Sequence, residues 1–347
     1  MKNNVINLAR QDIAEMKAYR SARSETLQGN VYLDANENAI CDTRYNRYRK
    51  QQPDQLAVLL AELYNIDRKR MLITRGSDEG IDLLIRLFCH ARLDKIIICP
   101  PTYGMYKVAA TIQGADTIEV PLSKDNGFTL DIDAILRAWN PRVKLIFLCS
   151  PNNPTGNVLS KVDILSLCAS LREKAIIVVD EAYIEFADDE SLTRYINQYP
   201  NLVILRTLSK AYGLAGVRCG ATIANSEIID LLTKIIAPYP IPEPVAEIVC
   251  QALNREIARS SIMVIRQEKE KMELFLQTLP SIKKVWKSHA NYLLIETAGA
   301  DMMMNACLRN GIVLRNRSNE YGLNNCIRIT IGSPGENKLL REVLRNV

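Results

Sequence analysis

The sequence predicts an α/β fold in which a large domain, with a mostly parallel sheet and helices on both faces, is joined to a smaller α+β domain. Two observations support this prediction. Short apolar runs rich in β-branched residues alternate with amphipathic helical patterns between residues 71 and 224. Beyond prolines at positions 238, 240, 242 and 244 the pattern changes and longer helical segments begin. Continuous apolar strands separated by helices are typical of a parallel sheet that is buried on both faces.

Six apolar runs predict the strands of the large sheet. They are residues 71–74, 95–99, 143–149, 175–180, 201–206 and 218–224. Helical patterns at 78–88 and 131–139 fall between runs, because their apolar residues recur at the spacing of one helix face. We expect the functional residues to lie beyond the carboxyl ends of these strands, where open α/β sheets bind ligands.

The proline-rich segment marks the predicted domain boundary, because proline interrupts helices. Runs at 285–297, 311–317 and 326–332 predict the strands of the smaller unit, and a terminal helix closes it. We therefore assign residues 46–240 to a large cofactor-binding domain. Residues 1–45 and 241–347 are assigned together to the small domain.

The composition excludes several classes of protein. With 347 residues, 48% hydrophobic and 24% charged, the chain is typical of a globular protein with a sizeable core. Its net charge of +5 is small and its basic residues are scattered, which argues against a nucleic-acid surface. No apolar run reaches the roughly 18 residues of a membrane span. The first residues also lack the apolar stretch of a secretory signal.

Cysteine and histidine usage narrows the chemistry. Nine cysteines are spread singly with no CxxC pair, which predicts reduced thiols in a cytoplasmic protein. The two histidines, His90 and His289, are too few to favour a histidine-based zinc site or a Ser-His-Asp triad. We therefore expect no metal and expect the chemistry to come from a bound cofactor.

Three segments place polar side chains directly after predicted strands. In "TRGSDEG" (74–80), Ser77 or Asp78 can cap a helix whose free N–H groups attract phosphate, although an ordinary strand–helix junction is the alternative. In "PPTYGMY" (100–106), Tyr103 can stack on a flat ring or simply pack at a domain seam. In "SPNNPTG" (150–156), the Asn153 amide can donate to an oxygen anion, or the segment can be a bare turn.

A fourth segment, "IIVVDEAYIEF" (176–186), places a carboxylate at the end of a strand that we expect to be buried. A buried charge without a partner is very costly. Asp180 therefore requires either an arginine of the chain or the protonated ring nitrogen of a cofactor. The hydroxyl of Tyr183, three residues later, can donate to an oxygen of the same ligand.

The fifth segment, "RTLSKAYGLAGVRCG" (206–220), joins a lysine to phosphate-binding groups. The amine of Lys210 can form a Schiff base with an aldehyde, whereas the alternative is a solvated loop with a lysine at its tip. The hydroxyls of Thr207 and Ser209 and the guanidinium of Arg218 suit phosphate. Pyridoxal phosphate requires a phosphate site, a stacking ring, oxygen donors, a buried anion and a lysine, so the combination favours that cofactor.

These segments resemble the signature segments of fold-type I pyridoxal-phosphate-dependent aminotransferases. "LDANEN", "GSDEGIDLLIR", "CPPTYGMY", "DEAYIEF", "RTLSKA" and "APYP" narrow the resemblance to the histidinol-phosphate aminotransferase family, over nearly the whole chain. The resemblance implies that Lys210 bonds to the cofactor and shuttles protons, that Asp180 pairs with the pyridinium, and that Tyr103 stacks on the ring. It also implies that Asn153 and Tyr183 hold the phenolic oxygen. The implied phosphate ligands are Ser77, Asp78, Thr207, Ser209 and Arg218.

The resemblance also implies a substrate subsite. Arg328 and Arg315 would bind the phosphate of one substrate and a carboxylate of the other, because arginine accepts either anion. Tyr19 and Asn36 would line the same site.

A further tyrosine has an implied role in a dimer. Tyr48 matches a tyrosine that the family donates across a homodimer to the neighbouring cofactor. The family usually has a proline directly after it, whereas here Arg49 and Lys50 follow. That departure puts the local turn at Tyr48 outside the family pattern.

The implied activity converts histidinol phosphate and 2-oxoglutarate to imidazole-acetol phosphate and glutamate, and the reverse, in a cytoplasmic homodimer. Two alternatives share the fold: an aromatic aminotransferase, and a lyase that resembles threonine-phosphate decarboxylase. A binding protein that kept the fold without the chemistry is disfavoured. The reason is that Lys210, Asp180, Asn153 and Arg218 are all present.

Overall fold

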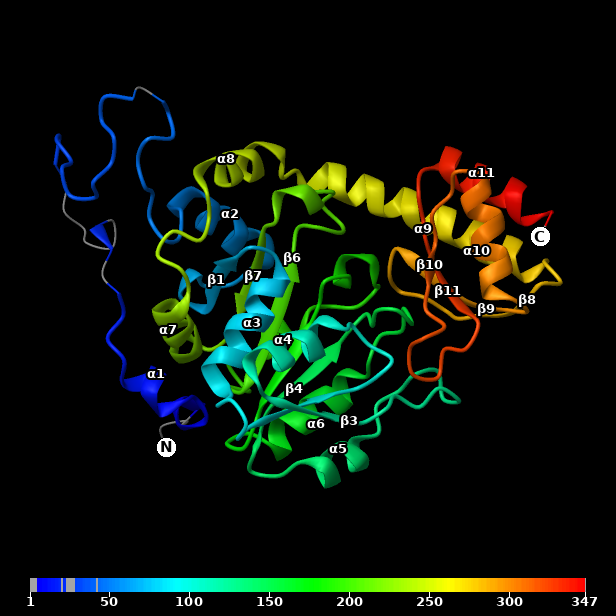
Figure 1. Cartoon of the computed structure of the whole chain (residues 1–347), viewed down its shortest axis with the longest axis horizontal. Coiled ribbons are helices and arrows are strands. Elements are labelled where there is room, and N and C mark those ends of the chain that lie inside the picture. Colours follow the sequence, from blue (N-terminus) through cyan, green and yellow to red (C-terminus); the bar gives the residue numbers. More distant parts are fainter. Residues whose placement is uncertain (1–4, 20, 23–28, 42, 347) are drawn as a thin grey trace.

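The computed structural model describes residues 5–19, 21–22, 29–41 and 43–346 (Figure 1). Within these residues the chain forms a seven-stranded sheet in the order β1-β7-β6-β5-β4-β2-β3 and a four-stranded sheet in the order β10-β11-β9-β8. Strands β2 to β6 run parallel, whereas β7 is antiparallel to both β1 and β6. The predicted α/β class, with its mostly parallel sheet and second smaller unit, is confirmed.

All six predicted strands of the large sheet are present, and one further strand was missed. The strands are β1 (Met71–Thr74), β2 (Lys95–Ile98), β3 (Asp116–Glu119), β4 (Val143–Cys149), β5 (Ile176–Asp180), β6 (Leu202–Thr207) and β7 (Gly220–Ile223). The missed strand, β3, lies at the edge of the sheet and pairs only with β2. Because its side chains stay partly exposed, its sequence "DTIE" lacks the continuous apolar run that identifies a buried strand.

Two layers of helices cover the large sheet. One face carries α3 (Ser77–Phe88), α4 (Met105–Gln113) and α7 (Ser226–Ile235). The other carries α2 (Asp54–Tyr64), α5 (Ile132–Ala138), α6 (Lys161–Ser170) and α8 (Glu243–Ala252). Strand β5 shows why both faces need cover, since Ile176 and Val178 point into one core and Ile177 and Val179 into the other. Full burial stabilises each such side chain by roughly 1.5–3 kcal/mol.

The C-terminal unit is built on the small antiparallel sheet. Its elements are α9 (Arg255–Gln277), β8 (Ile282–Val285), β9 (Tyr292–Thr297), α10 (Ala300–Arg309), β10 (Arg315–Asn316), β11 (Cys326–Thr330) and α11 (Pro334–Leu344). The run at 285–297, predicted as one strand, is the end of β8, a turn and β9. Helix α11 begins at a capping box in which Ser333 and Glu336 satisfy each other's backbone N–H groups.

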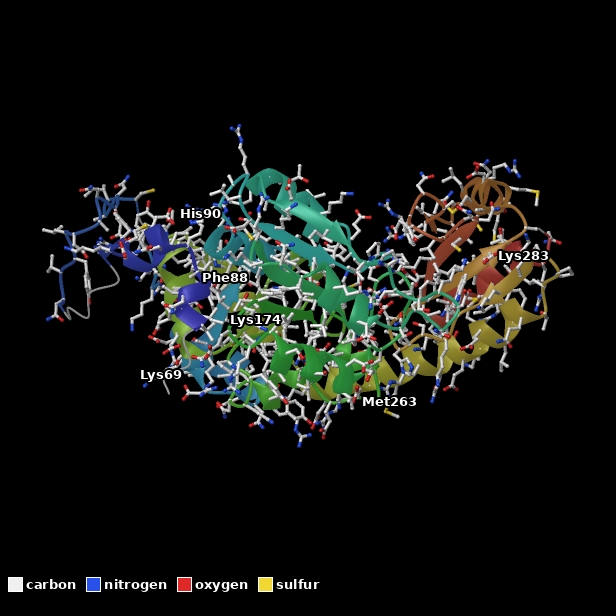
Figure 2. All side chains as sticks on the ribbon, turned by 90° about the horizontal axis from the view of Figure 1, so that it is seen from below. Lys69, Phe88, His90, Lys174, Met263 and Lys283 are labelled. Carbon is white, nitrogen blue, oxygen red and sulfur yellow. The ribbon has the colours of Figure 1, made fainter. Side chains whose placement is uncertain are left out.

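The N-terminal segment does not join the C-terminal unit as the sequence predicted. Figures 1 and 2 place the two at opposite ends of the molecule. Helices η1 (Val5–Leu8) and α1 (Gln11–Glu15) pack on α7, because Val5, Leu8 and Ile13 bury their apolar side chains in the core on that face of the large sheet. The domain boundaries at residues 46 and 240 stay a prediction.

Short 3₁₀ helices complete the described chain. They are η3 (Arg68–Arg70), η4 (Ile184–Phe186), η5 (Leu192–Tyr195) and η6 (Ala215–Val217). Among the described residues, no helix combines the length and the apolar character that crossing a membrane requires.

Strand β7 begins at Gly220, where the backbone at the start of α3 lies close to the large sheet. A Cβ atom built on Gly220 would lie 2.6 Å from the carbonyl oxygen of Arg206, 2.8 Å from the carbonyl carbon of Gly76 and 2.9 Å from the nitrogen of Ser77. These neighbours are backbone atoms and cannot rotate away. Only glycine therefore allows the start of α3 to approach the ends of β6 and β7.

We predict that Gly220→Ala lowers the free energy of unfolding by about 1–3 kcal/mol, because the added methyl group overpacks three backbone atoms. Urea denaturation of the cofactor-free protein measures this loss. Gly104→Ala is the matched control, since a Cβ there meets nothing within 4 Å and the residue has φ −65°. Equal stability of the two variants would contradict the prediction.

Candidate active site

A cavity of about 350 Å³ lies where the carboxyl ends of β4, β5 and β6 face the small sheet. This volume is within the range of small-molecule sites. Most of the residues that the sequence predicted for the site line it. The lining residues are Ser77, Asp78, Tyr103, Cys149, Asn153, Asp180, Ala182, Tyr183, Thr207, Ser209, Lys210, Arg218, Arg315, Arg317 and Arg328.

Three predicted site residues, Tyr19, Asn36 and Tyr48, do not line the cavity of their own chain. Tyr19 is 74% exposed, and Asn36 is also exposed. The ring of Tyr48 is 50% exposed and stacks on Tyr239, with 4.3 Å between ring centroids. The chain around Tyr48 is held against α8 by an ion pair of Arg49 with Glu243. Tyr48 was expected at the cavity of a partner chain, so the roles of Tyr19, Asn36 and Tyr48 stay predictions.

One end of the cavity gathers anion-binding groups at the start of α3. The helix begins at Ser77 without a side-chain cap, so the N–H groups of its first turn have no partner within the helix. The Arg218 guanidinium donates to the Ser209 hydroxyl at 3.2 Å and pairs with the Asp78 carboxylate at 3.3 Å. The Thr207 hydroxyl donates to the Ser209 hydroxyl at 3.0 Å. A helix start, two hydroxyls and a guanidinium together form a site for phosphate.

The carboxylate of Asp180 is buried in the floor of the cavity and is only 2% exposed. The Tyr106 hydroxyl donates to its Oδ2 at 2.8 Å, and the Ala182 backbone N–H donates to its Oδ1 at 3.1 Å. Burial raises the pKa of Asp180 to about 6, against the lowering effect of these two hydrogen bonds. Within the described residues no cation pairs with it. The carboxylate therefore favours a cationic ligand group above it.

Sequence analysis missed the partner of Asp180. Tyr106 lies in the first turn of α4, is fully buried, and stacks on Phe147 with 4.9 Å between ring centroids. Its ring also meets the edge of Tyr103 at 5.6 Å. The signal was present in "PPTYGMY", where a second hydroxyl-bearing ring follows Tyr103 by three residues. Nothing local distinguishes this tyrosine from a residue that only packs.

Lys210 projects from the loop after β6, with its Nζ atom 5.5 Å from the centroid of the Tyr183 ring. The backbone closes this loop, because the N–H of Leu208 donates to Cys219 and that of Leu214 donates to Leu208. Burial, followed by the positive charge of Arg328, lowers the pKa of Lys210. A lowered pKa increases the fraction of neutral amine, which is the nucleophilic form.

Arginines of the small sheet form the other end of the cavity. Arg315 of β10 lies directly opposite Arg328 of β11. The Arg328 guanidinium donates to Asn153 Oδ1 at 2.6 Å and lies 5.3 Å from the centroid of the Tyr292 ring. Because Oδ1 accepts from the guanidinium, the amide nitrogen of Asn153 is the end that can donate to a ligand.

A third arginine at this end, Arg317, was not predicted. It lines the cavity, donates to Asn153 Oδ1 at 3.5 Å and pairs with Glu320. The sequence signal was the second arginine in "LRNRS", two residues after Arg315. Its backbone N–H donates to the Cys326 carbonyl of β11, so Arg317 continues the pairing of β10 and, two residues after Arg315, points to the same face.

The cavity is strongly cationic. Among the residues that line it, Lys210 and four arginines outnumber the carboxylates of Asp78 and Asp180. The cations gather at two ends, one at the start of α3 and one on the small sheet. The arrangement suits ligands that carry anionic groups at both ends, with an amine between them that can attack a carbonyl carbon.

Comparison with known proteins decides the family. The family model "Aminotransferase class I and II" matches residues 11–347. The chain belongs to the aminotransferase class I and II family. The family predicted from the strand-end segments is therefore confirmed.

Two relatives within this aminotransferase family are similar over most of their length. The chain is 43% identical to a histidinol-phosphate aminotransferase of Yersinia pseudotuberculosis over 96% of this chain and 89% of that protein. It is 41% identical to one of Francisella philomiragia over 98% and 95%. A Sinorhizobium meliloti histidinol-phosphate aminotransferase solved in complex with pyridoxal-5'-phosphate shares the fold. It has a TM-score of 0.77 at 23% identity, over 86% of this chain and 83% of that chain.

We predict a pH-dependent difference in stability between the cofactor-free wild type and Asp180→Asn. The pKa of Asp180 is about 6 in the folded protein and has an ordinary value of 3.8. The folded chain therefore holds a proton that the unfolded chain releases, and the wild type loses stability as the pH rises from about 4 through 6. The asparagine variant lacks this loss, so its stability relative to the wild type should rise by roughly 2–3 kcal/mol between pH 4 and pH 8.

Urea denaturation across this pH range measures the difference, because the other titrating groups are common to both proteins. Tyr106→Phe is the companion variant. It removes the hydroxyl that donates to the Asp180 carboxylate, so the pKa of Asp180 should rise further. The loss of folding stability should then extend to higher pH than in the wild type. A difference between wild type and Asp180→Asn that stays constant with pH would contradict the assignment.

Proposed function

We propose that the chain is a pyridoxal-phosphate-dependent aminotransferase acting on histidinol phosphate and 2-oxoglutarate, with imidazole-acetol phosphate and glutamate as products of the reversible exchange. The observation that carries the proposal is the cavity that joins an unpaired buried carboxylate, a lysine of lowered pKa and two cationic ends. Relatives of the same name at 41–43% identity support the choice of substrate.

The residues present fit the cofactor. The start of α3 with Thr207, Ser209 and Arg218 would hold its phosphate, and the close approach at Gly220 keeps this cradle free of side chains. Tyr103, whose hydroxyl donates to Asp78 at 3.0 Å, would stack on its ring. The protonated nitrogen of such a ring would give the Asp180 carboxylate the cationic partner that it lacks among the described residues.

Pyridoxal phosphate supplies an aldehyde that exchanges with amino groups and a ring that accepts the electron pair of a broken C–H bond. Asp180 would pair with the ring nitrogen and favour its protonated form. Asn153 and Tyr183 would donate to the phenolic oxygen. Lys210 Nζ would act as the base that takes the proton from the substrate carbon bearing the amine, and as the acid that returns a proton to that position with the second substrate.

The arginine end would bind the distal anion of each substrate in turn. Histidinol phosphate carries a phosphate and no carboxylate, whereas glutamate carries two carboxylates. Arg328 and Arg315 face each other across the paired strands and can bind either group in the same place. One amino group is exchanged at a time, so the two substrates use the cavity in alternation.

The proposal includes a cytoplasmic homodimer. Exposed Tyr45 and Tyr48, next to α8, form an aromatic surface on the same side as the N-terminal segment. In a dimer this surface would bring Tyr48 of one chain to the cavity of its partner, although Arg49 and Lys50 follow it where the family usually has proline.

The purified protein should transaminate histidinol phosphate with 2-oxoglutarate, and do so far better than it transaminates phenylalanine or tyrosine. A panel of amino donors, read by glutamate formation, measures this. Lys210→Ala should lower the rate by about 10³-fold or more, because the group that moves the proton is lost. Robust activity on the aromatic amino acids with none on histidinol phosphate would refute the substrate assignment, and release of carbon dioxide would indicate a lyase.

A mixing experiment tests whether Tyr48 acts across the dimer. Lys210→Ala subunits are inactive but carry an intact Tyr48, and Tyr48→Phe subunits carry an intact Lys210. If each tyrosine serves the neighbouring site, subunit exchange creates one complete site per mixed dimer and activity rises above both parents. Activity that only averages the two parents contradicts the exchange of tyrosines. Size-exclusion chromatography with light scattering gives the oligomeric state.

A further inference from the structure

Arg317 lies in the cavity without a role in the proposed function. It directly follows β10, and only 16% of its side chain is exposed. One terminal nitrogen pairs with the Glu320 carboxylate, and the other donates to Asn153 Oδ1 at 3.5 Å. Glu320, three residues later in the same loop, is thus its counter-ion.

Two guanidinium groups converge on one neutral acceptor. Arg328 donates to the same Asn153 oxygen at 2.6 Å. The charge of Arg317 is, after burial, the largest cause that lowers the pKa of Arg328, so the two groups repel each other at close range. The amide oxygen carries no net charge, so among the described residues Glu320 is the one carboxylate that pairs with either guanidinium, and Arg328 has no ion-pair partner. An anion between them would remove the repulsion.

The same cluster keeps unused hydrogen-bonding capacity. Among the described residues, the Nε atoms of Arg317 and Arg328 and the Oε2 atom of Glu320 are buried without a partner. Buried polar atoms are nearly always satisfied in folded proteins, so exceptions that gather at one place require an explanation. A ligand with several acceptor oxygens would use the two free N–H groups.

We propose that Arg317 determines specificity for a phosphorylated amino donor by exchanging Glu320 for the substrate's phosphate. This inference rests on the proposed function, because it concerns the same cavity and its substrate. If a substrate carboxylate replaces Glu320 beside Arg317, one monoanion replaces another, and the binding free energy gained is small. Exchange for a phosphate replaces a monoanion by a near-dianion with three acceptor oxygens. A phosphate therefore displaces Glu320 from Arg317, whereas a carboxylate does not.

Arg317→Gln tests the proposal, because glutamine keeps a donor but loses the charge. We expect kcat/KM for histidinol phosphate to fall by about 10- to 100-fold, the usual effect of losing a charge-assisted contact. For glutamate, kcat/KM should change by less than about 3-fold. The two half-reactions are followed separately by the absorbance of the bound cofactor. Arg317→Lys should restore part of the loss.

Two further variants sharpen the test. Glu320→Gln removes the competing carboxylate, so kcat/KM for glutamate should rise several-fold and the preference for histidinol phosphate should shrink. Arg309→Gln is the matched control, since Arg309 is an exposed arginine of α10 in the same unit and should leave both half-reactions unchanged. Thermal melting of each holoenzyme verifies that the variants are folded.

Inorganic phosphate gives a readout that does not depend on the substrate. It should inhibit the amino-donor half-reaction competitively, with an inhibition constant that rises about 10-fold or more in Arg317→Gln and not in Arg309→Gln. Equal losses for histidinol phosphate and glutamate, or an unchanged inhibition constant, would overturn the proposal. If the wild type rejects histidinol phosphate, the proposed function fails, and phosphate inhibition against whichever donor it accepts still decides the role of Arg317.

Discussion

The buried carboxylate of Asp180 is the constraint on which the site depends. It ends a strand whose other residues are completely enclosed by apolar layers, and only 2% of Asp180 is exposed, so water solvates its charge poorly. Tyr106 and one backbone N–H stabilise the carboxylate only in part, and its pKa remains raised. A cofactor with a protonated ring nitrogen would remove this penalty. The cost of burying the carboxylate would therefore contribute to the affinity for such a cofactor.

The neighbouring residue, Glu181, shows the contrast. It is buried to the same extent, but Arg206 pairs with it at 3.5 Å and with Glu185 at 2.8 Å. Arg206 is the penultimate residue of β6, so this ion pair links the end of β5 to the end of β6. The paired carboxylate is structural, and it holds in place the two strand ends that carry the unpaired carboxylate and Lys210.

The cavity depends equally on the contact between the two sheets. Trp286, Leu294, Leu323 and Cys326 of the C-terminal unit belong to the same apolar core as β4 and β6. This shared core brings β11 to the end of β4, where Arg328 reaches Asn153. Residues more than 170 positions apart in the chain therefore line one cavity.

The sequence by itself determined the strands buried on both faces and the residues that follow them, among them Asn153, Asp180 and Lys210. Continuous apolar runs and polar residues at their ends are local patterns, so they can be read without coordinates. The edge strand β3 was not predicted, because its partly exposed side chains interrupt the continuous apolar run that identifies a buried strand.

Tertiary structure alone decided which of several similar side chains act together. Tyr106 is one of 14 tyrosines, and only packing brings it to Asp180. Arg317 and Arg328 meet through the pairing of β10 with β11 and a shared acceptor, Asn153. The N-terminal helices pack on α7, because their apolar residues are buried in the core on that face of the large sheet. Such pairings depend on contacts between distant segments, and their energies arise only when the chain has folded.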